Sequence, residues 1–195
     1  MVKKIEPPEQ RHGRATKLVY IAAVAAICAT LVATTAARAA DVGLGDLRAA
    51  MRSLGFLDSL QNHSTISIGV VYAGDNRDGR DQAQRVAGML ASISGPDTST
   101  IQASTITAED LVKSARRFDA LYLMPGTAAN GSLITDFIKR QHMVSISSDP
   151  ACLDGRYCVL MVQGGSGVNI VLDTALAAAV GAHFSSVFTM IVKRR

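Results

Sequence analysis

Strands and helices alternate along most of the chain, as the spacing of its apolar positions indicates. Largely apolar, β-branched runs predict strands, and apolar residues spaced by one helical turn predict the helices between them. The predicted strands cover residues 65–72, 100–106, 120–124 and 143–147. The predicted helices cover residues 46–60, 81–94 and 107–117, and a region around 133–138. This alternation is typical of right-handed crossovers and a parallel sheet with helices on both faces.

The last third of the chain departs from this rhythm. Two short predicted strands, 158–163 and 168–172, are joined by Gly164-Gly165-Ser166-Gly167, a connection that suits an antiparallel hairpin. A helix over 174–180, closed by Gly181, and a final helix over 184–192 are expected to follow. The predicted fold is therefore α/β: a single three-layer domain with a mainly parallel sheet and an antiparallel C-terminal edge.

The first forty residues have the layout of a secretory signal peptide. Five basic side chains between Lys3 and Lys17 precede an uncharged apolar run, Leu18 to Ala33, and Ala37-Arg38-Ala39 supplies the small residues of a cleavage site. An uncleaved membrane anchor is the alternative, although a spanning helix needs roughly 20 apolar residues. We therefore expect residues 1–39 to be a signal peptide cleaved near Ala39, and residues 40–195 to form one periplasmic domain.

Removal of the signal peptide changes the charge balance. The whole chain carries 20 basic and 16 acidic residues, a net charge of +4. Residues 1–39 hold six of the basic and two of the acidic residues, which leaves 14 of each in the mature chain. A neutral mature chain without a basic stripe gives no reason to expect nucleic-acid binding.

Cys152 and Cys158 are the two cysteines of the mature chain. An oxidising compartment favours their pairing, and the short segment between them can close a loop, so we expect a disulfide. Two free thiols are the alternative. A zinc site is less favoured because no histidine lies near the pair at ligand spacing.

No catalytic or metal-binding motif emerges from the sequence. The glycine-rich 164–167 segment is followed by a strand-like run and contains no Gly-Lys-Ser/Thr, so a hairpin turn is favoured over a phosphate loop. His63, His142 and His183 are scattered, and the chain has no Gly-x-Ser-x-Gly nucleophile elbow. We therefore expect no enzyme activity, no catalytic residues, no metal site and no cofactor.

One positional argument concerns ligand binding. In parallel α/β sheets, ligands bind outside the carboxyl ends of the strands. The segments that leave these ends carry hydroxyl, amide and charged side chains able to hold a small polar ligand. The candidate ligand-binding residues are Asn76, Arg77, Thr127, Ser148 and Asp149. The alternative is that these segments are ordinary solvated loops.

The C-terminal third follows an order of features known from one protein family. A strand ending in Ser148-Asp149 is followed by the 152–158 cysteine segment, a strand with Asn169, and an Ala-rich helix with an apolar stretch over 177–188. In this order the chain resembles the YfiR family of small periplasmic regulators. The resemblance implies a periplasmic repressor that holds an inner-membrane diguanylate cyclase inactive, and so controls cyclic-di-GMP and biofilm formation. Its partner would be the periplasmic region of that cyclase, and a homodimer is left open.

A second interpretation comes from another class of protein. The segments 68–72, 119–123 and 147–149 also look like parts of one lobe of a solute-binding protein for a transport system. Such proteins have two lobes around a cleft, and the length of this chain allows one. An enzyme ranks third, because no motif supports it.

Overall fold

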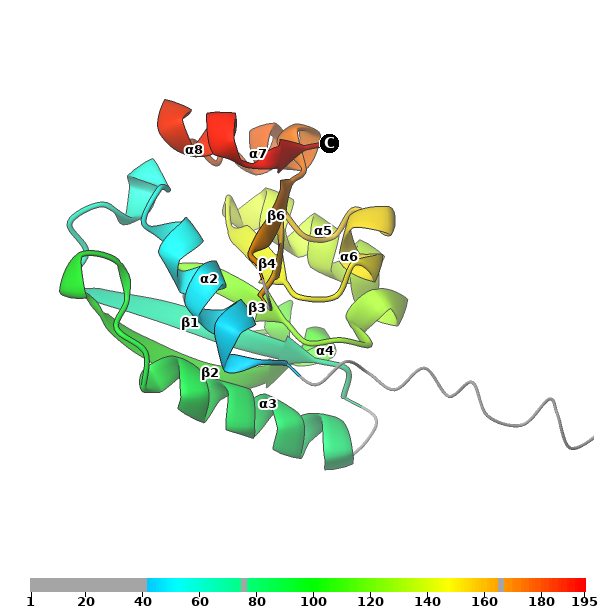
Figure 1. Cartoon of the computed structure of the whole chain (residues 1–195). Helices are drawn as coiled ribbons and strands as arrows, with labels where there is room; N and C mark the ends of the chain where they lie inside the picture. Colours follow the sequence, from blue (N-terminus) through cyan, green and yellow to red (C-terminus); the bar gives the residue numbers. More distant parts are fainter. Residues whose placement is uncertain (1–41, 75–76, 165–166) are drawn as a thin grey trace, which may run out of the picture. The chain divides into compact units, whose positions relative to one another are not determined.

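The computed structural model describes residues 42–74, 77–164 and 167–195, which fold around one mixed sheet (Figure 1). The order of its seven strands is β2-β1-β3-β4-β5-β6-β7. The strands are β1 (Thr65–Tyr72), β2 (Thr100–Thr107), β3 (Ala120–Leu123), β4 (Val144–Ser147), β5 (Leu160–Gln163), β6 (Asn169–Leu172) and β7 (Lys193–Arg194). The α-helices are α2 (Leu44–Leu54), α3 (Arg77–Ala91), α4 (Ala108–Leu111), α5 (Gly131–Gln141), α6 (Ala151–Asp154), α7 (Thr174–Val180) and α8 (Ser186–Ile191).

The strand directions confirm the predicted fold class. Five strands of the sheet run parallel to one another: β2, β1, β3, β4 and β5. The next strand, β6, pairs with β5 in the antiparallel direction. The hairpin at the C-terminal edge therefore exists as predicted. The short strand β7, which pairs in parallel with β6, was not expected.

Helices cover both faces of the sheet and enclose the core between them. Helices α2 and α3 contact each other, while α4, α5 and α7 form a second contiguous layer. Every residue of β3 and β4 is buried, as expected for central parallel strands covered on both faces. The described residues from 42 onward form one compact unit with a hydrophobic core of its own, as independently folding domains do.

Three predicted helices have different bounds in the structure. The helix predicted over 46–60 ends at Leu54, where Gly55 serves as C-cap, and a short 3-10 turn follows over Asp58–Leu60. The helix predicted over 81–94 begins earlier, at Arg77, within the segment that was expected to be a loop. The helix predicted over 107–117 starts at its expected cap but ends at Leu111.

The C-terminal segment combines two predicted features with unexpected ones. Helix α7 has the predicted bounds, and Gly181 closes it with a left-handed conformation, φ 69°. The predicted helix over 184–192 is shorter: α8 covers Ser186–Ile191, and the chain then extends into β7. Cys152 and Cys158 form the expected disulfide, with a Cα–Cα distance of 5.4 Å, around the short helix α6.

The predicted signal peptide lies outside the described residues. Within the described ranges, no helix is both long enough and apolar enough to cross a bilayer.

Candidate functional site at the carboxyl edge of the sheet

The strand order places a topological switch point between β1 and β3. The chain leaves β1 for the outer strand β2, then returns on the other side of β1 to form β3. The two crossover helices α3 and α4 therefore leave on opposite faces, and their divergence opens a crevice at the carboxyl ends of β1 and β3. Ligands of parallel α/β proteins bind in this crevice.

A cavity of about 270 Å³ occupies this position. Its wall is built from the ends of β1 and β3 and from the first two turns of α3. The lining residues are Tyr72, Ala73, Asp78, Gly79, Gln82, Met124, Pro125 and Gly126. The Asp78 carboxylate can accept hydrogen bonds from a cationic or hydroxyl group, and the Gln82 amide can both donate and accept. The site is therefore suited to a small polar ligand.

The turn after β3 fixes the floor of this cavity. Gly126 adopts a left-handed conformation, φ 88°, which favours glycine, and its missing side chain would point into open space. The buried Thr127 hydroxyl donates a hydrogen bond of 3.0 Å to the carbonyl of Met124 and closes the turn. Thr127 does not line the cavity itself, and its hydroxyl stabilises the turn next to it.

Ser148 and Asp149, at the end of β4, are also engaged with the protein itself. The Tyr122 hydroxyl donates to Ser148 Oγ at 3.1 Å, and Gln163 Nε2 donates to the Ser148 carbonyl at 3.3 Å. Asp149 Oδ1 accepts a hydrogen bond of 3.0 Å from the backbone N–H of Ala151 and so stabilises the turn into α6. Burial raises the pKa of Tyr122 above its usual range.

Tyr157 lies beside this group with its hydroxyl buried. The hydroxyl makes no hydrogen bond of normal geometry within the described structure, although Thr127 lies close enough to lower its pKa slightly. Burial and the nearby Asp149 carboxylate outweigh this effect and raise the pKa of Tyr157. The ring occupies the space that side chains at Gly131 and Gly155 would need, because a Cβ there would lie 2.8 and 2.6 Å from ring atoms.

The start of α2 covers another part of the carboxyl edge. The Asp46 carboxylate accepts hydrogen bonds from the backbone N–H groups of Gly43 and Gly164. A Cβ at Gly164 would lie 2.7 Å from the backbone of Gly45, so the two segments are in close contact. The end of β5 is therefore covered by α2, whereas the ends of β1 and β3 line the cavity.

The structure places the five predicted ligand residues in different surroundings. Asn76 lies outside the described residues. Arg77 is the exposed first residue of α3 and does not line the cavity. Thr127, Ser148 and Asp149 lie near one another, around Tyr157 and Tyr122, with their polar atoms bonded to the protein. Their role as ligand residues remains a prediction.

Sequence reasoning missed Asp78 and Gln82, which do line the cavity. Asp78 lies in the segment 74–80, which was expected to be a loop, and Gln82 lies in the predicted helix 81–94. In the structure both belong to α3, whose start at Arg77 places them at the cavity. The available signal was the acidic residue Asp78, because acidic side chains favour the first turn of a helix. Within the described residues, no group of three or more His, Cys, Asp or Glu side chains could hold a metal ion.

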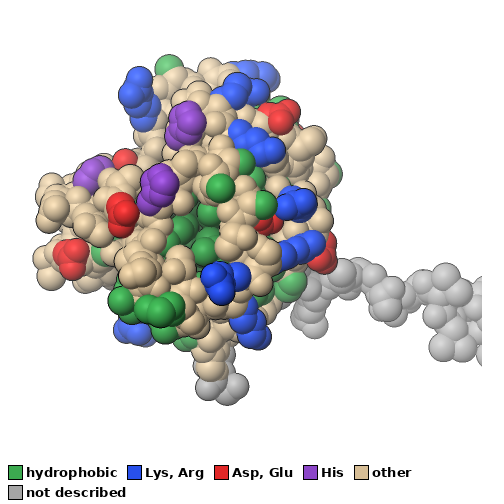
Figure 2. Space-filling model, turned by 90° about the horizontal axis from the view of Figure 1, so that it is seen from above, with side chains coloured by type: hydrophobic (Ala, Val, Ile, Leu, Met, Phe, Trp, Pro, Cys, Tyr) green, Lys and Arg blue, Asp and Glu red, His purple; other side chains and the backbone are tan. Residues whose placement is uncertain are grey.

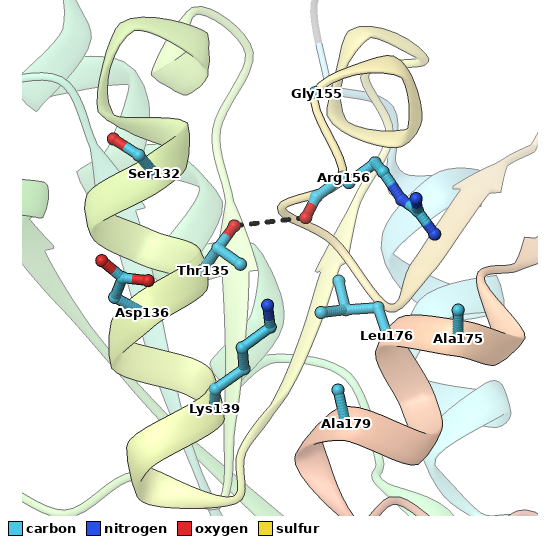
Figure 3. A pocket seen from close by; sticks show the side chains of 9 residues that line it. All are labelled: Ser132, Thr135, Asp136, Lys139, Gly155, Arg156, Ala175, Leu176 and Ala179. Atoms are coloured by element: carbon cyan, nitrogen blue, oxygen red, sulfur yellow. Dashed lines mark hydrogen bonds between the residues drawn. The ribbon is translucent and has the colours of Figure 1, made fainter.

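A second cavity, of about 470 Å³, lies between α5 and α7 (Figure 3). Asp136, Lys139 and Arg156 line it, and Thr135 Oγ1 donates to the Arg156 carbonyl at 3.2 Å. Arg156 Nε also lies 3.7 Å from the buried carboxylate of Asp173, whose other oxygen caps α7 through the N–H of Leu176. The Arg156 charge thus compensates a buried carboxylate, which explains its position without a ligand.

Comparison with known proteins gives matches among solved structures. No protein-family model matches the chain, and no curated protein matches it. An ABC domain in complex with L-Trp from Streptococcus pneumonia superposes with a TM-score of 0.55 at 10% identity, covering 77% of this chain and 62% of that one. The likeness shows the α/β fold.

Two further structures overlap less well. A conserved domain protein from Vibrio cholerae gives a TM-score of 0.47 at 14% identity, with 66% and 54% of the two chains covered. A ligand-free, open substrate-binding protein with adhesive properties from Clostridium difficile gives 0.48 at 11% identity, with 67% and 54% covered. The present chain thus spans between about half and three fifths of the length of the structures it matches.

Proposed function

We propose that this chain is an exported binding protein that holds a small polar ligand at the carboxyl ends of β1 and β3, as one lobe of a solute-binding protein does. The observation that carries the proposal is the cavity at the switch point, lined by Asp78 and Gln82. The match to a domain solved with L-Trp bound supports this class of function. We further propose that the chain acts by binding and has no catalytic activity.

An amino acid or a similar small ammonium compound fits the cavity best. Asp78 supplies a carboxylate for the ammonium group, and Gln82, one turn further along α3, supplies an amide for a second polar group. A cavity of about 270 Å³ limits the ligand to a small molecule. The apolar part of such a ligand would lie against Met124 and Pro125.

The experiment is a thermal-shift screen of residues 40–195 against amino acids, followed by calorimetric titration of any compound that stabilises the protein. Asp78→Asn should weaken binding roughly tenfold to a hundredfold, because a hydrogen bond to a charged group is lost. Asp81→Asn is the matched control: Asp81 is exposed on the same helix and does not line the cavity. Equal affinities of the two variants would contradict the proposal.

A regulatory role of the YfiR type is the second candidate, and one observation favours it. The apolar stretch that the resemblance includes, residues 177–188, leaves Val187 exposed, and Met190 and Ile191 just after it are exposed as well. An exposed apolar surface is what a protein that works by contact with a partner requires. Deletion of the gene should then raise cellular cyclic-di-GMP, whereas an unchanged level would count against this candidate.

A further inference from the structure

Exposed apolar side chains are concentrated at helix α8. Within the described ranges, three of the five exposed large hydrophobic residues belong to this helix: Val187, Met190 and Ile191 are 56%, 76% and 70% exposed. The remaining two are Leu44 and Val168. Phe188 points the other way and is buried, so α8 is apolar on both sides. A helix of this kind is normally covered on both sides, because exposed apolar area is unfavourable in water.

A groove of about 360 Å³ lies directly beside α8. Phe56 and Phe188 form its aromatic wall, with their ring centroids 5.0 Å apart. Ile191 of α8 and Val168 and Ile170 of the β6 segment complete the apolar lining. We use the name α8 surface for this groove together with Val187 and Met190.

The two charged side chains that line the groove of the α8 surface are both positive. Arg48 and Arg52, one turn apart on α2, are the charged residues that line the groove, and both are exposed. Lys193 and Arg194 come just after Val192, the C-cap of α8, and are also exposed. No acidic side chain lines the groove. Figure 2 shows hydrophobic side chains gathered on one face of the domain with Lys and Arg side chains beside them.

We propose that the α8 surface binds the surface of an anionic lipid bilayer. Exposed apolar residues on a short helix can insert at the boundary between headgroups and acyl chains, and neighbouring cations add attraction to anionic lipids. The proposal is independent of the ligand cavity, because no residue of the α8 surface lines that cavity.

A second copy of the chain fits the α8 surface less well. A two-fold symmetric contact would bring Arg48 and Arg52 of each copy onto the same small patch of the other. The groove has no acidic residue to compensate them. An anionic bilayer supplies the missing negative charge and accepts the apolar side chains at the same time.

The test is flotation of residues 40–195 with vesicles of phosphatidylcholine alone and of phosphatidylcholine with a quarter phosphatidylglycerol. We expect binding to the anionic vesicles and a decrease at high salt, since salt screens exposed charges. Met190→Asp with Ile191→Asp should lower the bound fraction at least tenfold. Arg48→Ala with Arg52→Ala should lower the partition coefficient roughly fivefold for each arginine.

Two control variants separate a specific surface from general charge attraction. Arg117→Ala with Arg140→Ala removes two exposed cations that line a different cavity, and should leave binding within twofold of the wild type. Gln84→Asp with Ala91→Asp adds two carboxylates at exposed positions of α3, and should also preserve binding. The unfolding temperature of each variant confirms that it is folded, because all these side chains are exposed.

Three results would overturn the proposal. The first is no binding of the folded wild type to anionic vesicles at low salt. The second is an equal loss of binding in the Arg48/Arg52 and Arg117/Arg140 pairs. The third is a stable dimer in sedimentation equilibrium that Met190→Asp with Ile191→Asp converts to monomer, since the α8 surface would then be an interface between copies of the chain.

Discussion

The ring of Phe188 stacks on the ring of Phe56, with the centroids 5.0 Å apart and the planes 21° from parallel. The ring of Phe184 also stacks on Phe188, with the centroids 5.2 Å apart. The backbone N–H of Ser185 also donates to the carbonyl of Phe56 at 2.9 Å. The position of α8 therefore depends on Phe56, in the turn that follows α2, more than 120 residues earlier in the chain.

Replacing Phe188 should destabilise the domain strongly. Phe188→Ala removes a fully buried ring and should lower the free energy of unfolding by about 3 kcal/mol, from lost burial and the cavity left behind. Urea unfolding measures this change. Val187→Ala, on the exposed side of α8, is the control and should stay within about 0.5 kcal/mol of the wild type. Similar losses in both variants would show that α8 is not packed as described.

Reduction of the disulfide should also destabilise the protein. In the loop-closure account, the bond between Cys152 and Cys158 contributes about 2 kcal/mol to the free energy of unfolding. Urea unfolding with and without a reductant gives the difference. Mass spectrometry of alkylated, unreduced protein tests the pairing itself, and the labelling of two thiols in exported protein would contradict it.

The two buried tyrosines should respond differently to loss of the hydroxyl. Tyr122→Phe removes the donor to Ser148 and should cost about 1 kcal/mol at neutral pH. Tyr157→Phe removes a hydroxyl without a well-formed hydrogen bond and should be neutral or stabilising. Equilibrium unfolding of both variants distinguishes the two environments, and an equal cost would contradict this description.

Stability should fall at high pH because both tyrosines have a raised pKa in the folded state. The ordinary tyrosine pKa is 10.0, so above that pH the unfolded chain ionises while the folded protein resists ionisation. The contribution of the two tyrosines to the free energy of unfolding is fully present below pH 10 and is lost as the pH rises above 10. Tyr157→Phe should reduce this loss. A pH profile unchanged by the substitution would mean that Tyr157 ionises freely when folded.

The elements with strong local signals could be predicted from the sequence. Strand β1 and helix α7 have the predicted bounds, because an apolar β-branched run and an Ala-rich run between a cap and a glycine leave few alternatives. Thr107 caps α4 as its sequence indicates, accepting from the Asp110 N–H at 3.0 Å. The helix ends at Leu111, and three residues later Ser114 Oγ accepts from the Arg116 N–H, a bond that competes with continued helical bonding.

The candidate site depends on contacts that local patterns do not contain. Asp46 and Gly164 bond across 118 residues, and Tyr157 packs on Gly131 from a different segment. Arguments from strand order indicated the edge of the sheet at which this cavity lies, but they could not distinguish residues that line the cavity from those bonded to the protein. That Asp78 and Gln82 line the cavity became clear only from the position of α3 in the structure.

The most direct test of ligand binding at the switch point is a map of backbone amide shifts by nuclear magnetic resonance. Residues 40–195 would be titrated with a compound that stabilises the protein in the amino-acid screen. The account predicts the largest shifts at Tyr72 and Ala73, around Asp78 to Gln82, and at Met124 and Gly126. Shifts confined to the α5–α7 cavity, or no binding by any compound of the screen, would contradict it.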